Sequence, residues 1–313
     1  MAKVVFVNHR ISDHCGVYQY GAQTVEILTR SKKHEFIGVE CGSLSELRDI
    51  ARQHRPRAFI HNSHPAIMPW ITGVTHIEGP IHIGLFHDIH PEVLEAPPPD
   101  YWVNRWIAIA PQPATSSWLS IGRPVPNVDI SDITLPAKLT IKTFGIAFEH
   151  KRYKLLGDLI AHEFPDEEIF FEIHTIASFI DNDYTDERIR DEIYGTLRPL
   201  IPEHIDLSVT TGLKSREEVV RWLAASHINV LLYAPMKRCG PSSALDFCIS
   251  AGRPVLVTDS SQFDHVDLPK YPLQGIRDAY AAGTTGVEKY KNMWTEANFL
   301  ADYERIIDEV CGA

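Results

Sequence analysis

The sequence has few cysteines and no long apolar run. Five cysteines occur among its 313 residues, an odd number, and no CxxC pair is present. This pattern argues against a disulfide framework or a zinc knuckle and is typical of a reducing compartment. No uncharged apolar run approaches the roughly 20 residues that span a bilayer. The first residues, MAKVVFVNHR, lack the apolar segment and cleavage site of a signal peptide. We therefore expect a cytoplasmic protein without a transmembrane segment.

The sequence also lacks an excess of positive charge. Its formal net charge is -11 and its isoelectric point is about 5.8. An acidic chain repels phosphate backbones on average, which argues against indiscriminate binding to nucleic acid. Hydrophobic residues make up 44% and charged residues 23% of the chain, as in ordinary globular proteins. At about 150 residues per domain, the length suggests two domains.

Apolar segments and helical segments alternate along the first part of the chain. Strands are predicted at residues 3–8, 36–40, 57–62, 82–88 and 106–111, and helices at 17–30 and 43–54. Ser43 is the expected N-cap of the second helix, with Glu46 completing a capping box. Residues 124–136, bounded by prolines and without helical period, are interpreted as an interdomain linker.

The alternation then restarts. Strands are predicted at residues 139–148, 168–176, 205–213, 228–234 and 254–260. Helices are predicted at 153–163, 186–201, 215–227 with Ser215 as N-cap, and 242–252 ending at Gly252, followed by an amphipathic stretch over 286–310. Near-continuous apolar strands between helices indicate parallel sheets covered on both faces. The predicted fold is α/β, with two doubly wound Rossmann-like domains facing a cleft, residues 1–133 and 134–313, and a C-terminal helix.

Ligands of such sheets bind at the carboxyl ends of the strands. Residues 9–16 follow the first strand there and open a helix, whose N-terminus suits an anion or a polar ligand. His9, Arg10, Ser12 and Asp13 make this loop unusually dense in polar side chains for a simple turn. A single glycine excludes the GxGxxG dinucleotide fingerprint. The alternative is a capping loop with a tight turn.

The segment FHDIHP places two further polar residues, His87 and Asp88, at the end of the fourth strand. His87 is a candidate to orient a hydroxyl or to stabilise a transferring group. His87 and His90 together are two potential metal ligands, although no third ligand is evident. The remaining alternative is a structural histidine whose hydrogen bonds go to the backbone.

A basic segment follows the first strand of the second half. Gly145 permits close approach of the backbone to a ligand. Lys151 and Arg152 bring positive charge to a helix start, which is what a diphosphate requires. A solvated basic pair is the alternative interpretation.

The longest candidate segment runs from residue 233 to residue 255. A strand ends in a basic loop with Lys237 and Arg238, and Ser242 and Ser243 then begin a helix that Gly252 ends. The serines are suited to cap the helix and to meet phosphate oxygens, and the two cations are suited to stabilise a leaving diphosphate. Helix caps without any ligand are the alternative.

Several of these segments resemble GT-B glycosyltransferases, nearest the retaining family-4-like group. TFGIAFEHKRYKLLGDLI is similar to the segment that carries the donor-diphosphate lysine, which places Lys151 at that position. CISAGRPVLVTDS resembles the family's helix with a glycine-x-proline-valine exit, and FHDIHP the strand end that faces the donor sugar. Two family features are missing: Phe247 and Cys239 stand where two glutamates are usual, and Ile146 where an arginine is common.

The resemblance implies transfer of a sugar from a nucleotide-diphosphate-sugar, with retention and without a metal or a further cofactor. The donor is expected on the second domain and the acceptor on the first. The acceptor is a glycan, a lipid-linked group or a small molecule, with modified DNA disfavoured by the net charge. The assigned residues are His87 and Lys151 as catalytic; Cys15, Gly16, Gly145, Arg152, Lys237, Arg238, Ser242 and Ser243 as donor-binding; and His9, Arg10 and Asp88 on the acceptor side.

Three other functions remain open on the same fold. A non-catalytic nucleotide-sugar-binding protein would fit the missing glutamates. A nucleotide-sugar epimerase would convert the donor without an acceptor. A DNA-base glycosyltransferase is the third, and the net charge of -11 counts against it.

Overall fold

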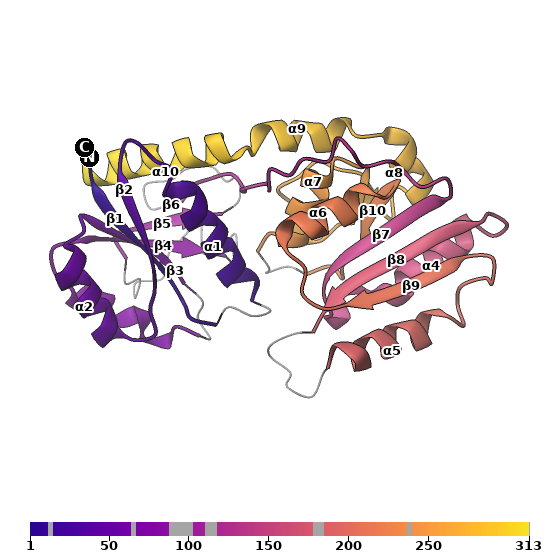
Figure 1. Cartoon of the computed structure of the whole chain (residues 1–313), viewed down its shortest axis with the longest axis horizontal. Helices are drawn as coiled ribbons and strands as arrows, with labels where there is room; N and C mark the ends of the chain where they lie inside the picture. The colour runs from indigo at the N-terminus through magenta and orange to yellow at the C-terminus, as the bar shows by residue number, and fades with distance from the viewer. Residues whose placement is uncertain are drawn as a thin grey trace. The chain divides into compact units, whose positions relative to one another are not determined.

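The structure is a computed structural model of the chain. It describes residues 1–11, 15–63, 67–87, 103–109, 118–177, 185–236 and 240–312. These residues form two compact units, which are described separately (Figure 1). The first unit holds the described residues up to Pro124 and from Glu296 onward. The second holds those from Val125 to Thr295, apart from residues 240 and 241, which group with the first.

The first unit is built on a six-stranded sheet with the order β2-β1-β3-β4-β5-β6, in which every pair is parallel. Its elements are β1 (Lys3–Asn8), α1 (Gly16–Leu28), β2 (Glu35–Glu40), α2 (Leu44–His54), β3 (Ala58–Asn62), η1 (Pro69–His76), β4 (Ile81–Phe86), β5 (Arg105–Ala108), β6 (Trp118–Ser120) and α10 (Glu296–Cys311). The chain adds β2 on one side of β1 and β3 on the other. The strand order therefore reverses between β1 and β3, which is the topological switch point of this sheet.

Alternate side chains of β1 enter two different cores. Val4 and Phe6 pack with α1 and α10, where Tyr303 and Ile307 are fully buried. Val5 and Val7 face the opposite side, where α2 and η1 cover the sheet. Successive side chains of a strand point to opposite faces of the sheet, so a strand that is apolar throughout needs helices on both faces. Figure 1 shows α1 and α10 lying along the sheet.

The second unit is built on a sheet with the order β12-β11-β10-β7-β8-β9, also parallel throughout. Its elements are β7 (Leu139–Ile146), η2 (Glu149–Lys151), α4 (Tyr153–Glu163), β8 (Ile169–Ile176), α5 (Asp186–Leu197), β9 (Asp206–Thr211), α6 (Arg216–Ala224), β10 (Ile228–Leu231), α7 (Ser243–Ala251), β11 (Val255–Thr258), η3 (Ser261–Phe263), β12 (Lys270–Tyr271), α8 (Ile276–Ala282) and α9 (Thr285–Met293). Here the switch point lies between β7 and β10.

Two cores again cover the two faces of this sheet. One packs Leu231, Val255 and Val257 against helices α6, α7 and α9. The other packs Ile173 and Val230 against α4, α5 and α8. The predicted α/β fold with two doubly wound parallel sheets is therefore confirmed.

The division of the chain differs from the expected one in two places. The expected boundary followed residue 133, whereas the structure divides the chain between Pro124 and Val125. The reason is that the expected linker packs on the second unit: Val128, Ile130 and Ile133 contact its core, and the Pro126 carbonyl accepts a hydrogen bond of 2.5 Å from Ser250 Oγ.

The C-terminal helical stretch also belongs to both units. It consists of α9, whose Val287 and Tyr290 are buried in the second unit, and α10, whose Phe299 and Tyr303 are buried in the first. Because each helix carries its own apolar stripe, the division falls between them, at Thr295. The expected assignment of the C-terminal helix to the second domain is corrected accordingly.

The two predicted helix caps have different outcomes. The Ser215 hydroxyl accepts from the Glu218 N–H and the Glu218 carboxylate accepts from the Ser215 N–H, which completes a capping box. Ser43 accepts from the Glu46 N–H as predicted. The Glu46 carboxylate, however, accepts from the Gly42 N–H, one residue earlier than a capping box requires.

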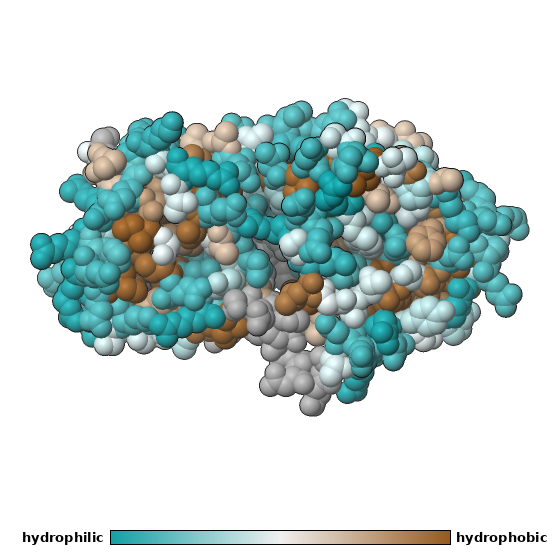
Figure 2. Space-filling view, in the orientation of Figure 1, coloured by the Kyte–Doolittle hydropathy of each residue, from teal (hydrophilic) through white to brown (hydrophobic). Residues whose placement is uncertain are grey.

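Apolar residues are mostly enclosed by these layers. Figure 2 shows a face on which hydrophilic residues separate the hydrophobic ones into small patches. Within the described part of the chain, no helix has the length and apolar composition needed to cross a membrane.

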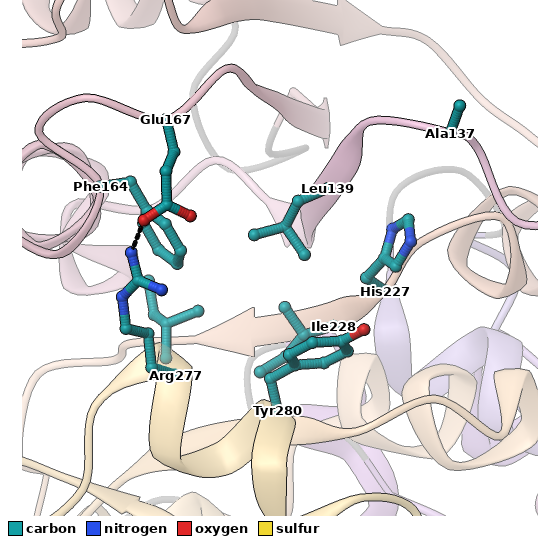
Figure 3. Close-up of a pocket in the computed structure, with 9 residues that line it drawn as sticks. Ala137, Leu139, Phe164, Glu167, His227, Ile228, Arg277 and Tyr280 are labelled. Atoms are coloured by element: carbon teal, nitrogen blue, oxygen red, sulfur yellow. Dashed lines mark hydrogen bonds and ion pairs between the residues drawn. The ribbon is translucent and has the colours of Figure 1, made fainter.

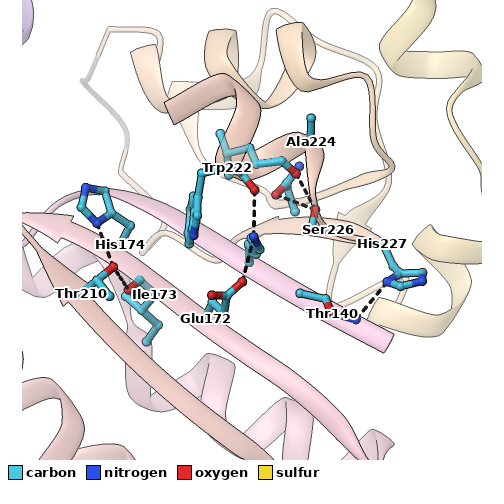
Figure 4. A network of polar contacts seen from close by, with 12 residues as sticks. Thr140, Glu172, Ile173, His174, Thr210, Trp222, Ala224, Ser226 and His227 are labelled. Atoms are coloured by element: carbon cyan, nitrogen blue, oxygen red, sulfur yellow. Dashed lines mark hydrogen bonds and ion pairs between the residues drawn. The ribbon is translucent and has the colours of Figure 1, made fainter. Parts of the chain in front are cut away.

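One buried ion pair links neighbouring strands of the second unit. Lys142 on β7 and Glu172 on β8 are register partners, and Lys142 Nζ lies 2.7 Å from Glu172 Oε2 (Figure 4). Lys142 Nζ also donates to the Trp222 carbonyl at 2.8 Å and lies 4.6 Å from the centroid of the Trp222 ring. Burial lowers the pKa of Lys142, while the Glu172 carboxylate acts in the opposite direction.

We predict that Lys142→Met lowers the free energy of unfolding by about 2 kcal/mol, because it leaves Glu172 largely buried without a cation. The double variant Lys142→Met/Glu172→Leu should recover most of this loss, since it removes both charges. Urea unfolding of the three proteins measures both effects. An unchanged midpoint for the single variant would show that the pair does not stabilise the sheet.

Candidate functional site

The switch point of the second sheet brings together residues from three segments. Gly145 lies near the end of β7, Lys151 ends η2, and Tyr233 follows β10. Lys151 Nζ lies 3.5 Å from the centroid of the Tyr233 ring. The Ala234 N–H donates to the His150 carbonyl at 2.7 Å and so holds η2 against the chain that leaves β10.

Gly145 is required for this arrangement. Its φ is +146°, in the region that L side chains rarely adopt, and an added Cβ would lie 3.0 Å from Lys151 Nζ. Its carbonyl accepts a hydrogen bond of 2.8 Å from Thr175 Oγ1, which fixes the end of the strand. Because Gly145 has no side chain, the Lys151 amine can lie against the backbone at this position.

Lys151 is a buried cation without an acidic partner among the described residues. Only 9% of the residue is exposed, and no ion pair of Lys151 occurs in the part of the chain that the structure describes. Burial lowers its pKa to about 7. Between the lowered pKa of about 7 and the ordinary value of 10.5, the Lys151 amine is protonated in the unfolded chain and neutral in the folded chain. Stability therefore rises with pH through this window, and an anion bound beside Lys151 would remove the penalty.

Ser242 contacts the hydroxyl end of Tyr233. Its hydroxyl donates to the Tyr233 hydroxyl at 3.3 Å, and its N–H donates to the Gln262 carbonyl at 3.2 Å. Ser242 occupies the N-cap position of α7 but makes no side-chain cap, so the expected capping by this serine is wrong. Ser243 is the first residue of α7 and is exposed. Lys151 and Ser242 thus share Tyr233 as a neighbour.

The switch point of the first sheet carries a second polar cluster. Asn8 ends β1, Asn62 ends β3, and His87 follows β4. His87 Nε2 lies 2.6 Å from Asn62 Oδ1, and Asn62 Nδ2 lies 2.9 Å from Asn8 Oδ1. The Tyr20 ring lies nearly perpendicular to the half-buried His87 ring, at a centroid distance of 5.2 Å.

The described residues of the predicted loop after β1 contact one another. His9 is 1% exposed: its N–H donates to Asn8 Oδ1, its Nδ1 accepts from the Ile11 N–H, and its Nε2 lies 3.4 Å from Cys15 Sγ. Burial raises the pKa of the Cys15 thiol. Arg10 is exposed and pairs with Glu46 of α2, and Gly16 begins α1.

Arg152 adopts φ 51° at the N-cap position of α4 and is half-buried. Asp88, His90, Lys237, Arg238 and Cys239 lie outside the described residues. Among the residues that are described, no group of three or more His, Cys, Asp or Glu side chains could hold a metal ion.

A pocket of about 410 Å³ lies elsewhere in the second unit (Figure 3). Leu139 and Ile228, which begin β7 and β10, line it, so it opens at the amino ends of the strands, opposite Lys151. Arg277 and Glu167 form an ion pair at its side. Its position separates it from the cluster at the switch point.

Sequence reasoning did not assign Tyr233 or Asn62 to the site. Asn62 ends β3 and Tyr233 follows β10 closely, and both strands flank a switch point; that position was the available signal. It could not show that the Tyr233 ring lies under Lys151 or that Asn62 contacts His87, because both contacts join residues more than 20 positions apart.

The fold defines the class of protein that this chain resembles. Two parallel six-stranded sheets with a C-terminal helix match solved GT-B glycosyltransferases, so the expected GT-B fold is confirmed. No protein-family model matches the sequence, and no curated protein matches it.

Three of the similar structures cover nearly the whole chain. A glycosyltransferase from Rickettsia africae has a TM-score of 0.67 and 9% identity, covering 99% of this chain and 98% of its own. The UDP-forming α,α-trehalose-phosphate synthase from Burkholderia xenovorans, in complex with glucose-6-phosphate, has a TM-score of 0.67, 10% identity and full coverage of both chains. A trehalose-6-phosphate protein from E. coli, bound with UDP-2-fluoro glucose, has a TM-score of 0.55 and 10% identity, covering 99% and 96%.

We predict that Gly145→Ala destabilises the protein by about 1–2 kcal/mol, because the new side chain adopts an unfavourable φ and presses on Lys151. The matched control is Gly195→Ala in α5, where a Cβ meets nothing within 4 Å. That change should stabilise the helix by about 0.5–1 kcal/mol. Thermal unfolding compares the variants, and equal melting temperatures would contradict the role given to Gly145.

Proposed function

We propose that this protein transfers a sugar from a nucleotide-diphosphate-sugar to an acceptor hydroxyl with retention of configuration at the anomeric carbon. The observation that carries the proposal is Lys151, a buried amine without an acidic partner among the described residues, at the switch point of the second sheet. A ligand with negative charge supplies the partner that this amine lacks. The backbone of Gly145 lies beside the Lys151 amine, and Ser242, which precedes α7, contacts the Tyr233 hydroxyl.

In the proposed reaction, the bond between the anomeric carbon and the diphosphate oxygen breaks and its electron pair leaves with the diphosphate. The acceptor oxygen forms the new bond to the same carbon, and its proton passes to an oxygen of the departing phosphate. Charged Lys151 stabilises the negative charge that develops on the leaving group, and Ser242 and Ser243 hold its oxygens.

The nucleoside diphosphate is supported by two of the similar structures. One is named for forming UDP and another holds UDP-2-fluoro glucose. We assign the same class of donor to the second unit, with Arg152, Lys237 and Arg238 as further cations. The acceptor is assigned to the first unit, where His87 receives a substrate hydroxyl and His9, Arg10 and Asp88 are further acceptor-side residues.

One observation favours a second candidate, a nucleotide-sugar-binding protein without turnover. Phe247 replaces one of the two glutamates usual in the resembling family, and its ring packs edge-on against Phe144 at a centroid distance of 5.5 Å. This candidate predicts binding of the nucleotide-sugar without release of the diphosphate.

We predict that Lys151→Met lowers kcat/KM for sugar transfer about 10²–10³-fold, because one charge that stabilises the leaving group is lost. The assay follows release of nucleoside diphosphate from UDP-, GDP-, ADP- and dTDP-sugars, with chromatography of the remaining sugar to detect epimerisation. Lys154→Met is the matched control, since Lys154 is an exposed lysine on α4.

The Lys154→Met protein should keep the wild-type rate. Equal rates for both variants would remove Lys151 from the site. Binding of a nucleotide-sugar without release of diphosphate would favour the non-catalytic candidate, and conversion of the donor without acceptor would favour an epimerase.

We also predict that UDP binds more weakly as the pH rises from 7 to 9. The amine must be charged to bind the diphosphate, its pKa in the free protein is about 7, and the phosphate is already ionised in this range. The limiting slope is about tenfold in Kd per pH unit. Isothermal titration calorimetry in buffers of different ionisation enthalpy should detect proton uptake on binding. Lys151→Met should bind weakly with little dependence on pH; a wild-type Kd that does not change with pH would refute the role of this amine.

A further inference from the structure

The orientation of one amide in the first unit can be deduced from backbone groups alone. Asn8 Nδ2 lies 3.1 Å from the Tyr18 carbonyl, and the His9 N–H lies 3.1 Å from Asn8 Oδ1. A carbonyl only accepts and a backbone N–H only donates. Asn8 therefore presents its oxygen to the His9 N–H and its NH₂ group to Tyr18, and the reverse orientation would break both bonds.

This assignment determines the next amide. Asn62 Nδ2 lies 2.7 Å from the Val17 carbonyl and 2.9 Å from Asn8 Oδ1. Both neighbours are acceptors, so the NH₂ group of Asn62 donates both of its hydrogens to them. The remaining atom, Oδ1, can only accept.

The acceptor on Asn62 in turn determines the protonation of His87. His87 Nε2 lies 2.6 Å from Asn62 Oδ1, so Nε2 carries the hydrogen and donates it. A neutral imidazole has one N–H and one lone pair. In neutral His87 the lone pair is therefore on Nδ1.

The network leaves its members little freedom to change partners. Asn8 and Asn62 are almost fully buried, and both pack against Gly21 of α1. A Cβ on Gly21 would lie 2.4 Å from Asn62 Nδ2 and 2.8 Å from the Asn8 side chain. The missing side chain of Gly21 lets both amides reach the carbonyls of Val17 and Tyr18 in the first turn of α1.

We propose that Asn62 is a positioning residue that holds His87 in its Nε2–H tautomer, so that His87 meets a substrate hydroxyl through the lone pair of Nδ1 as a hydrogen-bond acceptor. The substrate in this statement rests on the proposed sugar transfer, whereas the tautomer follows from the hydrogen bonds of the first unit. A histidine fixed in this way accepts from a hydroxyl at Nδ1 and does not donate to it until it takes up a proton.

The Tyr20 ring on α1 lies nearly perpendicular to the His87 ring, and the Arg123 guanidinium lies 5.6 Å from the centroid of the Tyr20 ring. His9 and Cys15 belong to the neighbouring loop. None of these replaces the amide oxygen of Asn62 at Nε2, where the bond is 2.6 Å long.

The direct test is the tautomer of His87 in the wild-type protein. Two-bond ¹H–¹⁵N correlation spectra of ¹⁵N-histidine-labelled protein distinguish a protonated ring nitrogen from one with a lone pair. His87→Gln assigns the signals of this ring among the 16 histidines. Above the pKa of the ring, we expect the proton on Nε2 and the lone pair on Nδ1. A proton on Nδ1 overturns the proposal, whatever the activity of the protein.

A second measurement tests Asn62 itself. Asn62→Asp places a carboxylate against Nε2, which should raise the pKa of His87 by about 1–2 units and move the acid limb of kcat/KM upward by the same amount. The second carboxylate oxygen has no hydrogen for the Val17 carbonyl and Asn8 Oδ1, so this variant should also be less stable than the wild type. Asn104→Asp is the control: Asn104 Oδ1 accepts from the His82 N–H, a bond that the carboxylate retains. That change should leave the His87 titration where it was. Near-UV circular dichroism verifies that each variant is folded.

The two measurements separate this inference from the proposed function. The expected tautomer in a protein that consumes no nucleotide-sugar supports the role of Asn62 and refutes the transferase. An unshifted His87 titration in folded Asn62→Asp overturns the role of Asn62, even where sugar transfer is found.

Discussion

Parallel strands bring their last residues to one edge of a sheet, and the candidate sites depend on this constraint. In each unit the strand order reverses once, between β1 and β3 and between β7 and β10. At such a reversal the two connections leave on opposite faces, so the strand ends between them are not covered by a crossover. Asn8 and Asn62 occupy the first of these positions, and Gly145 and Tyr233 the second.

The two clusters use this position in different ways. In the second unit a cation is buried against an aromatic ring, and the unfavourable burial of Lys151 is what favours an anionic ligand. In the first unit the polar groups satisfy one another, so His87 is oriented before any ligand arrives. The described part of the second cluster gives Lys151 no counter-ion, which agrees with the proposed leaving group, and the first cluster is neutral and already ordered, which agrees with the proposed hydroxyl.

Much of the fold could be predicted from local patterns, since most strands and helices have the apolar period and the caps that their residues suggest. The strands β6 and β12 were not predicted, because two or three residues are too few to show a period; η1 and α8 were also missed. The break between α9 and α10 was missed for another reason. Both helices are amphipathic, so the sequence pattern continues through the break. The helices differ only in the core against which each packs. Lys151 and His87 could be singled out as residues that follow strands. Their partners depend on which strands become neighbours, and this pairing leaves no local pattern in the sequence.

The return of α10 to the first unit has a consequence for the order of folding during synthesis. Residues 125–295 are made as one nearly uninterrupted stretch, and they include both helical layers of the second sheet. The first sheet, although it is translated earlier, keeps part of one face uncovered until Phe299, Tyr303 and Ile307 have left the ribosome. These strands are thus made before the second unit and fully enclosed only after it, and a nascent chain would expose part of their apolar face while residues 125–295 are synthesised.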